Sequence, residues 1–166
     1  RIMEPYLTHS LGQCLRIRKK ELEESYSCDA ALIISFERLA ERLGQWEDYL
    51  RKYPDSLVKA DATALRDEYL RMLICGCSNT QPEVYEGGED IKGIYQRFVE
   101  RFPDTKSGNV VAAFAKKYEE HGWRFSQVYE YGCSLVSAEI VAPKDIWPAI
   151  QLDYRVRDYQ NKPFDR

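Results

Sequence analysis

One pattern of eight residues occurs twice in the chain, first as Tyr49-Leu50-Arg51-Lys52-Tyr53-Pro54-Asp55-Ser56 and again as Phe98-Val99-Glu100-Arg101-Phe102-Pro103-Asp104-Thr105. Each copy has two aromatic residues four positions apart, followed by Pro-Asp and a hydroxyl residue. Proline disfavours helical backbone in the residue before it, and Asp, Ser and Thr accept hydrogen bonds from the free amides of a new helix. The pattern therefore predicts a helix, a proline turn and a second helix, twice over.

The similarity between the two stretches continues on both sides of the turn at the same spacing. The matching pairs are Trp46 and Tyr95, Ala64 and Ala113, Leu65 and Phe114, and Tyr69 and Tyr118. A single helical hairpin cannot bury its apolar stripe, whereas stacked hairpins can. The sequence therefore predicts an all-α fold of stacked antiparallel helical hairpins. The alternative is a chance duplication of one helix-turn-helix corner.

The chain of 166 residues and 19.4 kDa suits one domain. We expect a single helical domain over 1–166, with a first repeat-like unit at 30–74 and a second at 91–122. A less regular C-terminal extension covers 123–166.

Apolar residues at helical spacing predict the individual helices. The expected helices are Pro5–Cys28, Ala30–Leu43 with Asp29 as its cap and Gly44 as its end, a short helix ending at Pro54, Leu57–Ile74, Ile91–Phe102, Val110–His121, and Phe125–Val141 with a defect at Gly132. Pro143 fits the start of a further short helix, and the segment from Tyr154 to Arg166 is polar. The aromatic and aliphatic residues expected in the core are Phe36, Leu39, Tyr53, Leu65, Tyr69, Phe98, Phe102, Phe114 and Tyr118.

The repeated turn resembles the aromatic-Pro-Asp-Ser junction of bacterial tetratricopeptide-like repeat proteins of the cell envelope. The resemblance covers residues 30–122 and implies binding of a protein or peptide along a concave helical face. The resemblance also implies a location in the bacterial periplasm or envelope, although the residues themselves leave a cytoplasmic location open. The sequence departs from the family in two ways, because Cys75 to Gly88 lengthens the repeat and the Trp-Leu-Gly-Tyr pattern of the first helix is absent.

Composition narrows the classes of partner. The net charge is −3, which disfavours a generally basic nucleic-acid binder, and no apolar run is long enough to span a bilayer. The run Arg16 to Lys20 is followed by acidic residues, so ion pairs such as Arg18–Glu21 and Lys19–Glu23 are expected on a solvated helix face. A phosphate-binding patch is the alternative interpretation of this run.

The sequence contains no pattern that predicts a metal ion or another cofactor. Cys75-Gly76-Cys77 lacks the second pair that a zinc site needs, and residues 86–90 lack the spacing of a calcium loop. The cysteines leave disulfides open, either between Cys14 and Cys28 or from the Cys75/Cys77 pair.

The favoured function is a non-catalytic helical-repeat adaptor that binds a protein or peptide. The residues expected to contact the partner, from their helical phase, are Arg66, Tyr69, Lys117, Tyr118, Trp123 and Arg124. Two alternatives remain: an immunity or inhibitor-type protein that binds one basic partner, and a small helical enzyme that uses acidic residues such as Glu68, Glu89 or Asp90. Oligomeric state is open.

Overall fold

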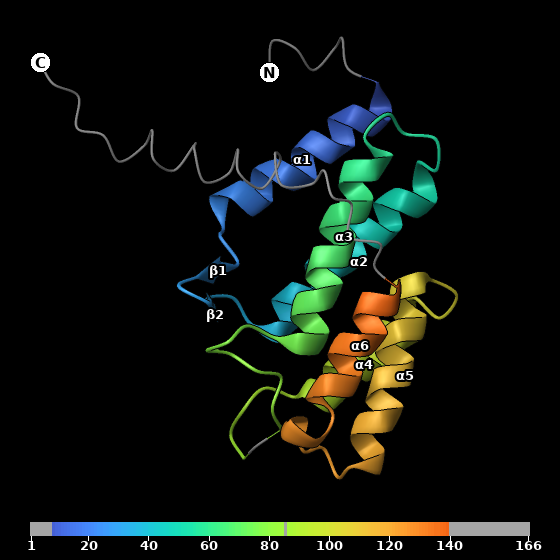
Figure 1. Ribbon diagram of the computed structural model, residues 1–166. Helices are drawn as coiled ribbons and strands as arrows, with labels where there is room; N and C mark the ends of the chain where they lie inside the picture. The colour runs from blue at the N-terminus through green and yellow to red at the C-terminus, as the bar shows by residue number, and fades with distance from the viewer. Residues whose placement is uncertain (1–7, 85, 140–166) are drawn as a thin grey trace, which may run out of the picture.

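A computed structural model describes residues 8–84 and 86–139, which form a predominantly helical structure (Figure 1). The elements in chain order are α1 (His9–Glu23), β1 (Ser27–Cys28), β2 (Ala31–Leu32), α2 (Phe36–Lys52), α3 (Lys59–Cys75), α4 (Ile91–Arg101), α5 (Lys106–Glu120), the 3-10 helix η2 (Phe125–Gln127) and α6 (Tyr129–Glu139). The two strands form one short antiparallel hairpin. The all-α prediction is therefore confirmed at the level of fold class for this part of the chain.

The helices associate mainly with their neighbours in the sequence. The turn at Pro54 joins α2 to α3, and the turn at Pro103 joins α4 to α5; the members of each pair pack along one another. Helix α6 lies against both α3 and α5, and α2 also contacts α4, so the two pairs share one core (Figure 1). Helix α1 packs against α2.

The predicted core is largely confirmed. Phe36, Leu39, Tyr69, Phe98, Phe102, Phe114 and Tyr118 are buried, whereas Tyr53 and Leu65 are only partly buried at its edge. Trp46 and Tyr95, the aromatic residues upstream of the two proline turns, are fully buried.

The two proline turns have closely similar geometry. Tyr53 (φ −130°, ψ 63°) and Phe102 (φ −127°, ψ 48°) end their helices with nearly the same backbone angles. The ring of Tyr53 lies 5.1 Å from that of Tyr49, and the ring of Phe102 lies 5.0 Å from that of Phe98. The two stretches thus share the backbone angles at the helix end and the aromatic contact before the proline.

The turns differ immediately after the proline. The Thr105 hydroxyl accepts the Gly108 amide at 3.0 Å and caps α5, as the sequence predicts. Ser56 does not cap α3, which starts at Lys59 without any side-chain cap. The Ser56 hydroxyl instead bonds the Tyr49 hydroxyl at 2.8 Å. Phe98 has no hydroxyl at the matching position, which leaves Thr105 available to cap.

The expected helix over Ala30–Leu43 begins too early. Asp29 (φ 47°) and Ala30 (φ 59°) have left-handed backbone and form the turn between β1 and β2, so Asp29 caps no helix. The cap of α2 is Ser35, whose hydroxyl accepts the Arg38 amide at 3.1 Å. The apolar run before it, which contains Leu32, continues the helical phase by coincidence.

Gly44 does not end a helix, contrary to the sequence prediction. Helix α2 runs through it to Lys52 and merges the two helices expected on either side. Gly44 is buried against Phe102, where a β-carbon would stand 2.8 Å from the ring. The glycine thus permits a close approach between α2 and the end of α4.

The ends of the described chain also differ in detail from expectation. The helix expected over Pro5–Cys28 is observed as α1, His9–Glu23, within the described residues. The helix expected over Phe125–Val141 is divided into η2 and α6, and Gly132 lies inside α6 against Phe114 and Ile74 rather than interrupting it. The elements expected at Pro143 and over Tyr154–Arg166 lie outside the described residues. Across 8–84 and 86–139, no helix combines the length and the apolar character needed to cross a membrane.

Candidate functional site

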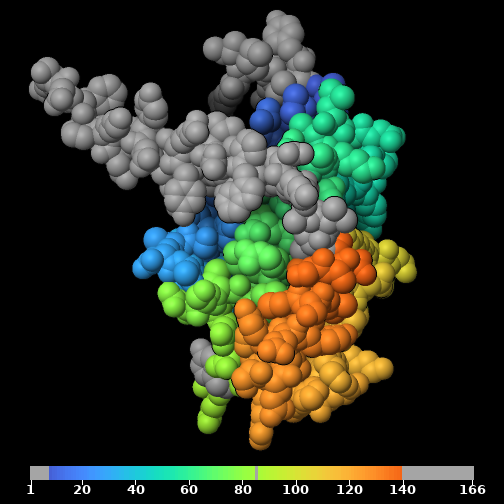
Figure 2. Space-filling model, viewed as in Figure 1, coloured from blue at the N-terminus to red at the C-terminus, as the bar shows by residue number. Residues whose placement is uncertain are grey.

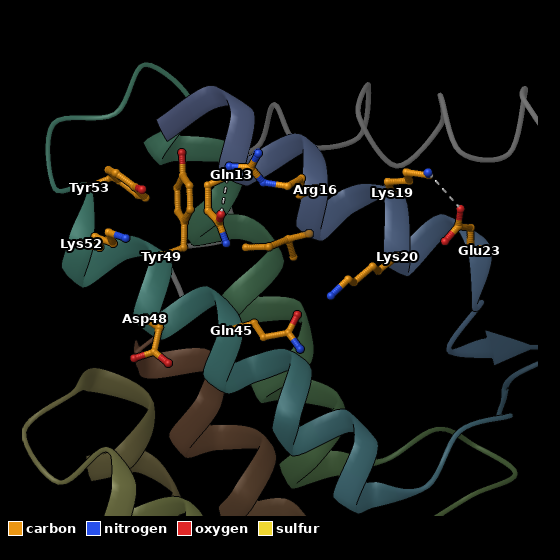
Figure 3. Close-up of a pocket in the computed structure, with 11 residues that line it drawn as sticks. Gln13, Arg16, Lys19, Lys20, Glu23, Gln45, Asp48, Tyr49, Lys52 and Tyr53 are labelled. Carbon is orange, nitrogen blue, oxygen red and sulfur yellow. Dashed lines mark hydrogen bonds and ion pairs between the residues drawn. The ribbon is translucent and has the colours of Figure 1, made fainter. Parts of the chain in front are cut away.

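A groove of ≈ 660 Å³ lies on the surface between α1 and α2, and we call it the α1–α2 groove (Figure 3). Its lining comes from one face of each helix and from the residue that follows α2. The lining residues are Gln13, Arg16, Ile17, Lys19, Lys20 and Glu23 of α1, and Gln45, Asp48, Tyr49, Lys52 and Tyr53 of α2 and its end.

Two hydrogen bonds, one buried and one partly buried, join α1 to α2 beside this groove. The Trp46 indole donates a hydrogen bond to Glu21 Oε1 at 2.7 Å, which places a carboxylate of α1 inside the core of α2. Near the start of α1, the Tyr49 hydroxyl donates to the Ser10 carbonyl at 3.2 Å. Only a narrow stripe of α1 is buried, so its remaining faces stay available to solvent.

The floor of the groove is apolar and aromatic. Ile17 is buried between the helices, and the Tyr49 ring stands between Gln13 and Tyr53 (Figure 3). Burial raises the pKa of the Tyr49 phenol, so this ring remains a neutral surface at physiological pH. Ile17 and Tyr49 are only 6% and 2% exposed, so the aromatic area that remains open to a ligand at this floor belongs to the half-buried Tyr53.

The rim of the groove carries more positive than negative charge. Four lining residues are cations: Arg16, Lys19, Lys20 and Lys52. Figure 3 shows Lys20 extending from α1 toward α2, and the Lys52 ammonium lies 5.4 Å from the centre of the Tyr53 ring. Among the described residues, neither Lys20 nor Lys52 has an ion-pair partner within 4 Å.

The two acidic residues of the rim already have cationic partners. Glu23 pairs with Lys19 at 3.7 Å on an exposed part of α1. Asp48 pairs with Arg51 at 2.7 Å and with Arg101 of α4 at 2.9 Å, and both arginines lie outside the groove lining. The groove is consequently a positive site on a chain whose net charge is −3.

Sequence reasoning identified the charges of α1 but not the groove. The predicted ion pairs Arg18–Glu21, at 2.6 Å, and Lys19–Glu23 are both present, but only the second lies on the expected solvated face, because Glu21 is buried against Trp46. The groove depends on the pairing of α1 with α2, which brings Lys20 to the same hollow as Lys52. The one sequence feature that could have indicated the groove is Lys52, the basic residue before Tyr53-Pro54. Lys52 lies one helical turn after Tyr49, on the face of α2 toward α1.

Three of the predicted partner-contacting residues belong to the core. Tyr69 and Tyr118 are 2% and 0% exposed. Arg66 is buried between carboxylates, with its Nε 2.6 Å from Asp67 and its Nη1 3.3 Å from Glu47. Their side chains join helices to one another rather than line an accessible face.

The other three predicted residues lie near the C-terminal end of α5, away from α1 (Figure 1). Lys117 pairs with Glu120 at 3.1 Å, and Arg124 is exposed. Trp123 is half-buried, with its ring 4.8 Å from that of Tyr118. None of these three lines the α1–α2 groove.

The carboxylates considered for catalysis have structural partners on separate elements. Glu89 accepts the Phe36 amide at 2.8 Å and thus holds the start of α2, and Asp90 accepts the Gly93 amide at 2.9 Å and caps α4. Glu68 on α3 bonds the Tyr26 hydroxyl at 3.2 Å. The three groups do not converge on one hollow.

No protein-family model matches the chain, and comparisons with curated proteins and with solved structures found no match either.

Proposed function

We propose that the chain is a non-catalytic adaptor of stacked helical hairpins, similar to tetratricopeptide-like repeats, that binds an acidic peptide segment of a protein partner in the α1–α2 groove. The observation that carries this proposal is an apolar floor beside Lys20 and Lys52, two cations that have no ion-pair partner within 4 Å among the described residues. The matching backbone angles of Tyr53 and Phe102, the residues before the two prolines, support the stacked-hairpin part of the proposal.

The expected ligand is an extended or helical peptide with alternating acidic and apolar side chains. Its carboxylates would lie near Lys20 and Lys52, while its apolar side chains would contact the half-buried Tyr53. Positive potential along the rim would speed association and select against basic peptides, and contact with the floor would slow dissociation. This chemistry requires no cofactor.

The experiment is fluorescence anisotropy with short labelled peptides of three kinds: acidic-apolar, the same sequence with amides replacing the acids, and the same sequence with lysines replacing them. The full chain should bind only the first kind, and rising salt should weaken binding. The double variant Lys20→Glu/Lys52→Glu should lose roughly tenfold or more in affinity, equivalent to about 1.4 kcal/mol. Lys116→Glu, an exposed charge reversal on α5, is the matched control and should bind as the wild type does.

Three outcomes would contradict the proposal. Equal binding of acidic peptide by the wild type and the double variant would remove the groove as the site. Preference for the lysine peptide would favour the inhibitor-type alternative with a basic partner, and preference for a single-stranded oligonucleotide over any peptide would favour nucleic-acid binding.

A further inference from the structure

A second hollow, of ≈ 360 Å³, lies where α3 ends beside α6, and sulfur atoms gather in it. Its lining includes Met72, Cys75, Cys77 and Cys133. In the space-filling view α6 (orange) lies directly beside α3 (green) on this face (Figure 2). This second hollow shares no lining residue with the α1–α2 groove, so it is a separate site.

The sulfur atoms of Cys75 and Cys133 lie 2.7 Å apart. Unbonded atoms rarely approach this closely, since even carbon atoms in contact are about 3.5–4.0 Å apart. Two thiolates on one tetrahedral zinc ion, with Zn–S bonds of about 2.3 Å, would stand about 3.8 Å apart. In the ranges 8–84 and 86–139, no three or more His, Cys, Asp or Glu side chains are grouped to hold a metal ion. The separation is therefore too short for metal ligands and suits a covalent bond.

The other cysteines are placed differently. Cys77 has its sulfur 3.4 Å from Met72 Sδ, Cys14 is a buried residue of α1, and Cys28 is exposed on β1. The pairing of Cys14 with Cys28 that the sequence left open thus finds no support, whereas a bond from the Cys75/Cys77 pair does. Burial, and then the neighbouring thiol of Cys133, raise the pKa of Cys75, so the reduced pair is a protonated contact rather than a thiolate site.

We propose that Cys75 and Cys133 are an oxidative cross-linking site, at which a disulfide fastens α6 to α3. In the reaction each thiol loses one proton and one electron, and one S–S bond forms. A small-molecule disulfide such as oxidised glutathione accepts both electrons and both protons and leaves as two thiols. The bond joins positions 58 residues apart and would hold Gly132 of α6 in its close contact with Phe114.

The test exposes the reduced full chain to oxidised glutathione, blocks free thiols and maps the cross-links by non-reducing mass spectrometry. Two of the five thiols should disappear, and the peptide containing Cys133 should be linked to the one containing Cys75. Trypsin leaves Cys75 and Cys77 in one peptide, since no lysine or arginine separates them. The variant Cys77→Ser should therefore keep the link, whereas Cys75→Ser should lose it.

The melting temperature provides the second readout. A disulfide closing a loop of this length should raise the Tm of the oxidised chain on the order of 5–10 °C over the reduced chain. The difference should vanish in Cys133→Ser and persist in Cys28→Ser, the exposed-cysteine control. Retention of all five thiols, a link from Cys77 instead of Cys75, or equal melting of the oxidised and reduced chains would overturn the proposal.

Discussion

The ring of Phe102, at the end of α4, lies directly on the backbone of Gly44 in the middle of α2. A β-carbon at Gly44 would stand 2.8 Å from ring Cε2 and 3.0 Å from ring Cζ. Because Phe102 is itself 3% exposed and packs on Phe98, its ring has little room to move. This contact joins the helix before the first proline turn to the second proline turn.

Gly44→Ala should therefore destabilise the chain, although alanine is the better helix former. The added methyl group forces Phe102 to move, at a cost of about 1–3 kcal/mol. The matched control is Gly12→Ala in α1, where the nearest atom to a new β-carbon is a flexible arginine nitrogen at 3.9 Å. The control should be neutral or should stabilise the chain by up to about 1 kcal/mol. Urea unfolding of both variants tests this, and a stabilised Gly44→Ala would contradict the observed contact.

Gly44 also explains why the sequence predicted the presence of helices better than their ends. A glycine after an amphipathic stretch is typical of a helix end. Nothing in the local sequence indicates that a ring from another helix packs on Gly44, so the end was predicted there. Gly44 and Gly132 both serve close packing, which depends on residues far away in the chain. The proline turns were predictable because their signals are local and strong.

The β1–β2 hairpin and the α1–α2 groove show the same limit. Asp29 and Ala30 adopt a left-handed backbone that neither residue type predicts. The sequence therefore predicted a helix where the structure has the β1–β2 hairpin. The groove needs Lys20 and Lys52 to meet across two helices whose pairing no local pattern specifies. The buried Arg66 was misplaced on a surface because its partners, Glu47 and Asp67, become visible only in three dimensions.

Core residues should contribute more to stability than the cap. Truncation of Phe102 or Phe114 to alanine should cost about 3–5 kcal/mol, because both rings are buried among other aromatic residues. Thr105→Ala removes the observed cap of α5 and should cost about 1 kcal/mol. Urea unfolding of the three variants side by side gives the order. A cap variant less stable than both core variants would mean that the helices do not pack through these faces.

The hydroxyl pair at the first turn should show energetic coupling. Tyr49→Phe and Ser56→Ala each break the 2.8 Å hydrogen bond between the two side chains. A double-mutant cycle should therefore give a coupling energy of about 0.5–1.5 kcal/mol. The control cycle pairs Tyr49→Phe with Thr105→Ala, two sites that share no hydrogen bond, and its effects should be additive. Equal coupling in both cycles would show that the hydroxyl contact is not what distinguishes the two turns.

Tyr118 should make stability fall in alkaline solution. Its hydroxyl donates to the Pro82 carbonyl at 2.8 Å, and burial, with a smaller contribution from Glu83, raises its pKa to about 12. In the unfolded chain a tyrosine titrates near pH 10, so between about pH 10 and about pH 12 the unfolded state loses this proton first. The unfolded state then binds fewer protons than the folded state, and the free energy of unfolding must decrease as pH rises.

The variant Tyr118→Phe separates this contribution from that of the other buried tyrosines. It should lose about 1 kcal/mol at neutral pH, because the Pro82 carbonyl loses its donor, and its unfolding free energy should fall less steeply than the wild type's above about pH 10. Tyr131→Phe is the control, since Tyr131 is 40% exposed on α6, and it should keep the wild-type slope. The measurement is the urea midpoint at a series of alkaline pH values, with phenolate absorbance recorded in parallel. If Tyr118→Phe and the wild type lose stability in parallel, the Tyr118 hydroxyl is not held protonated by burial, and its bond to the loop after α3 is not what closes this side of the core.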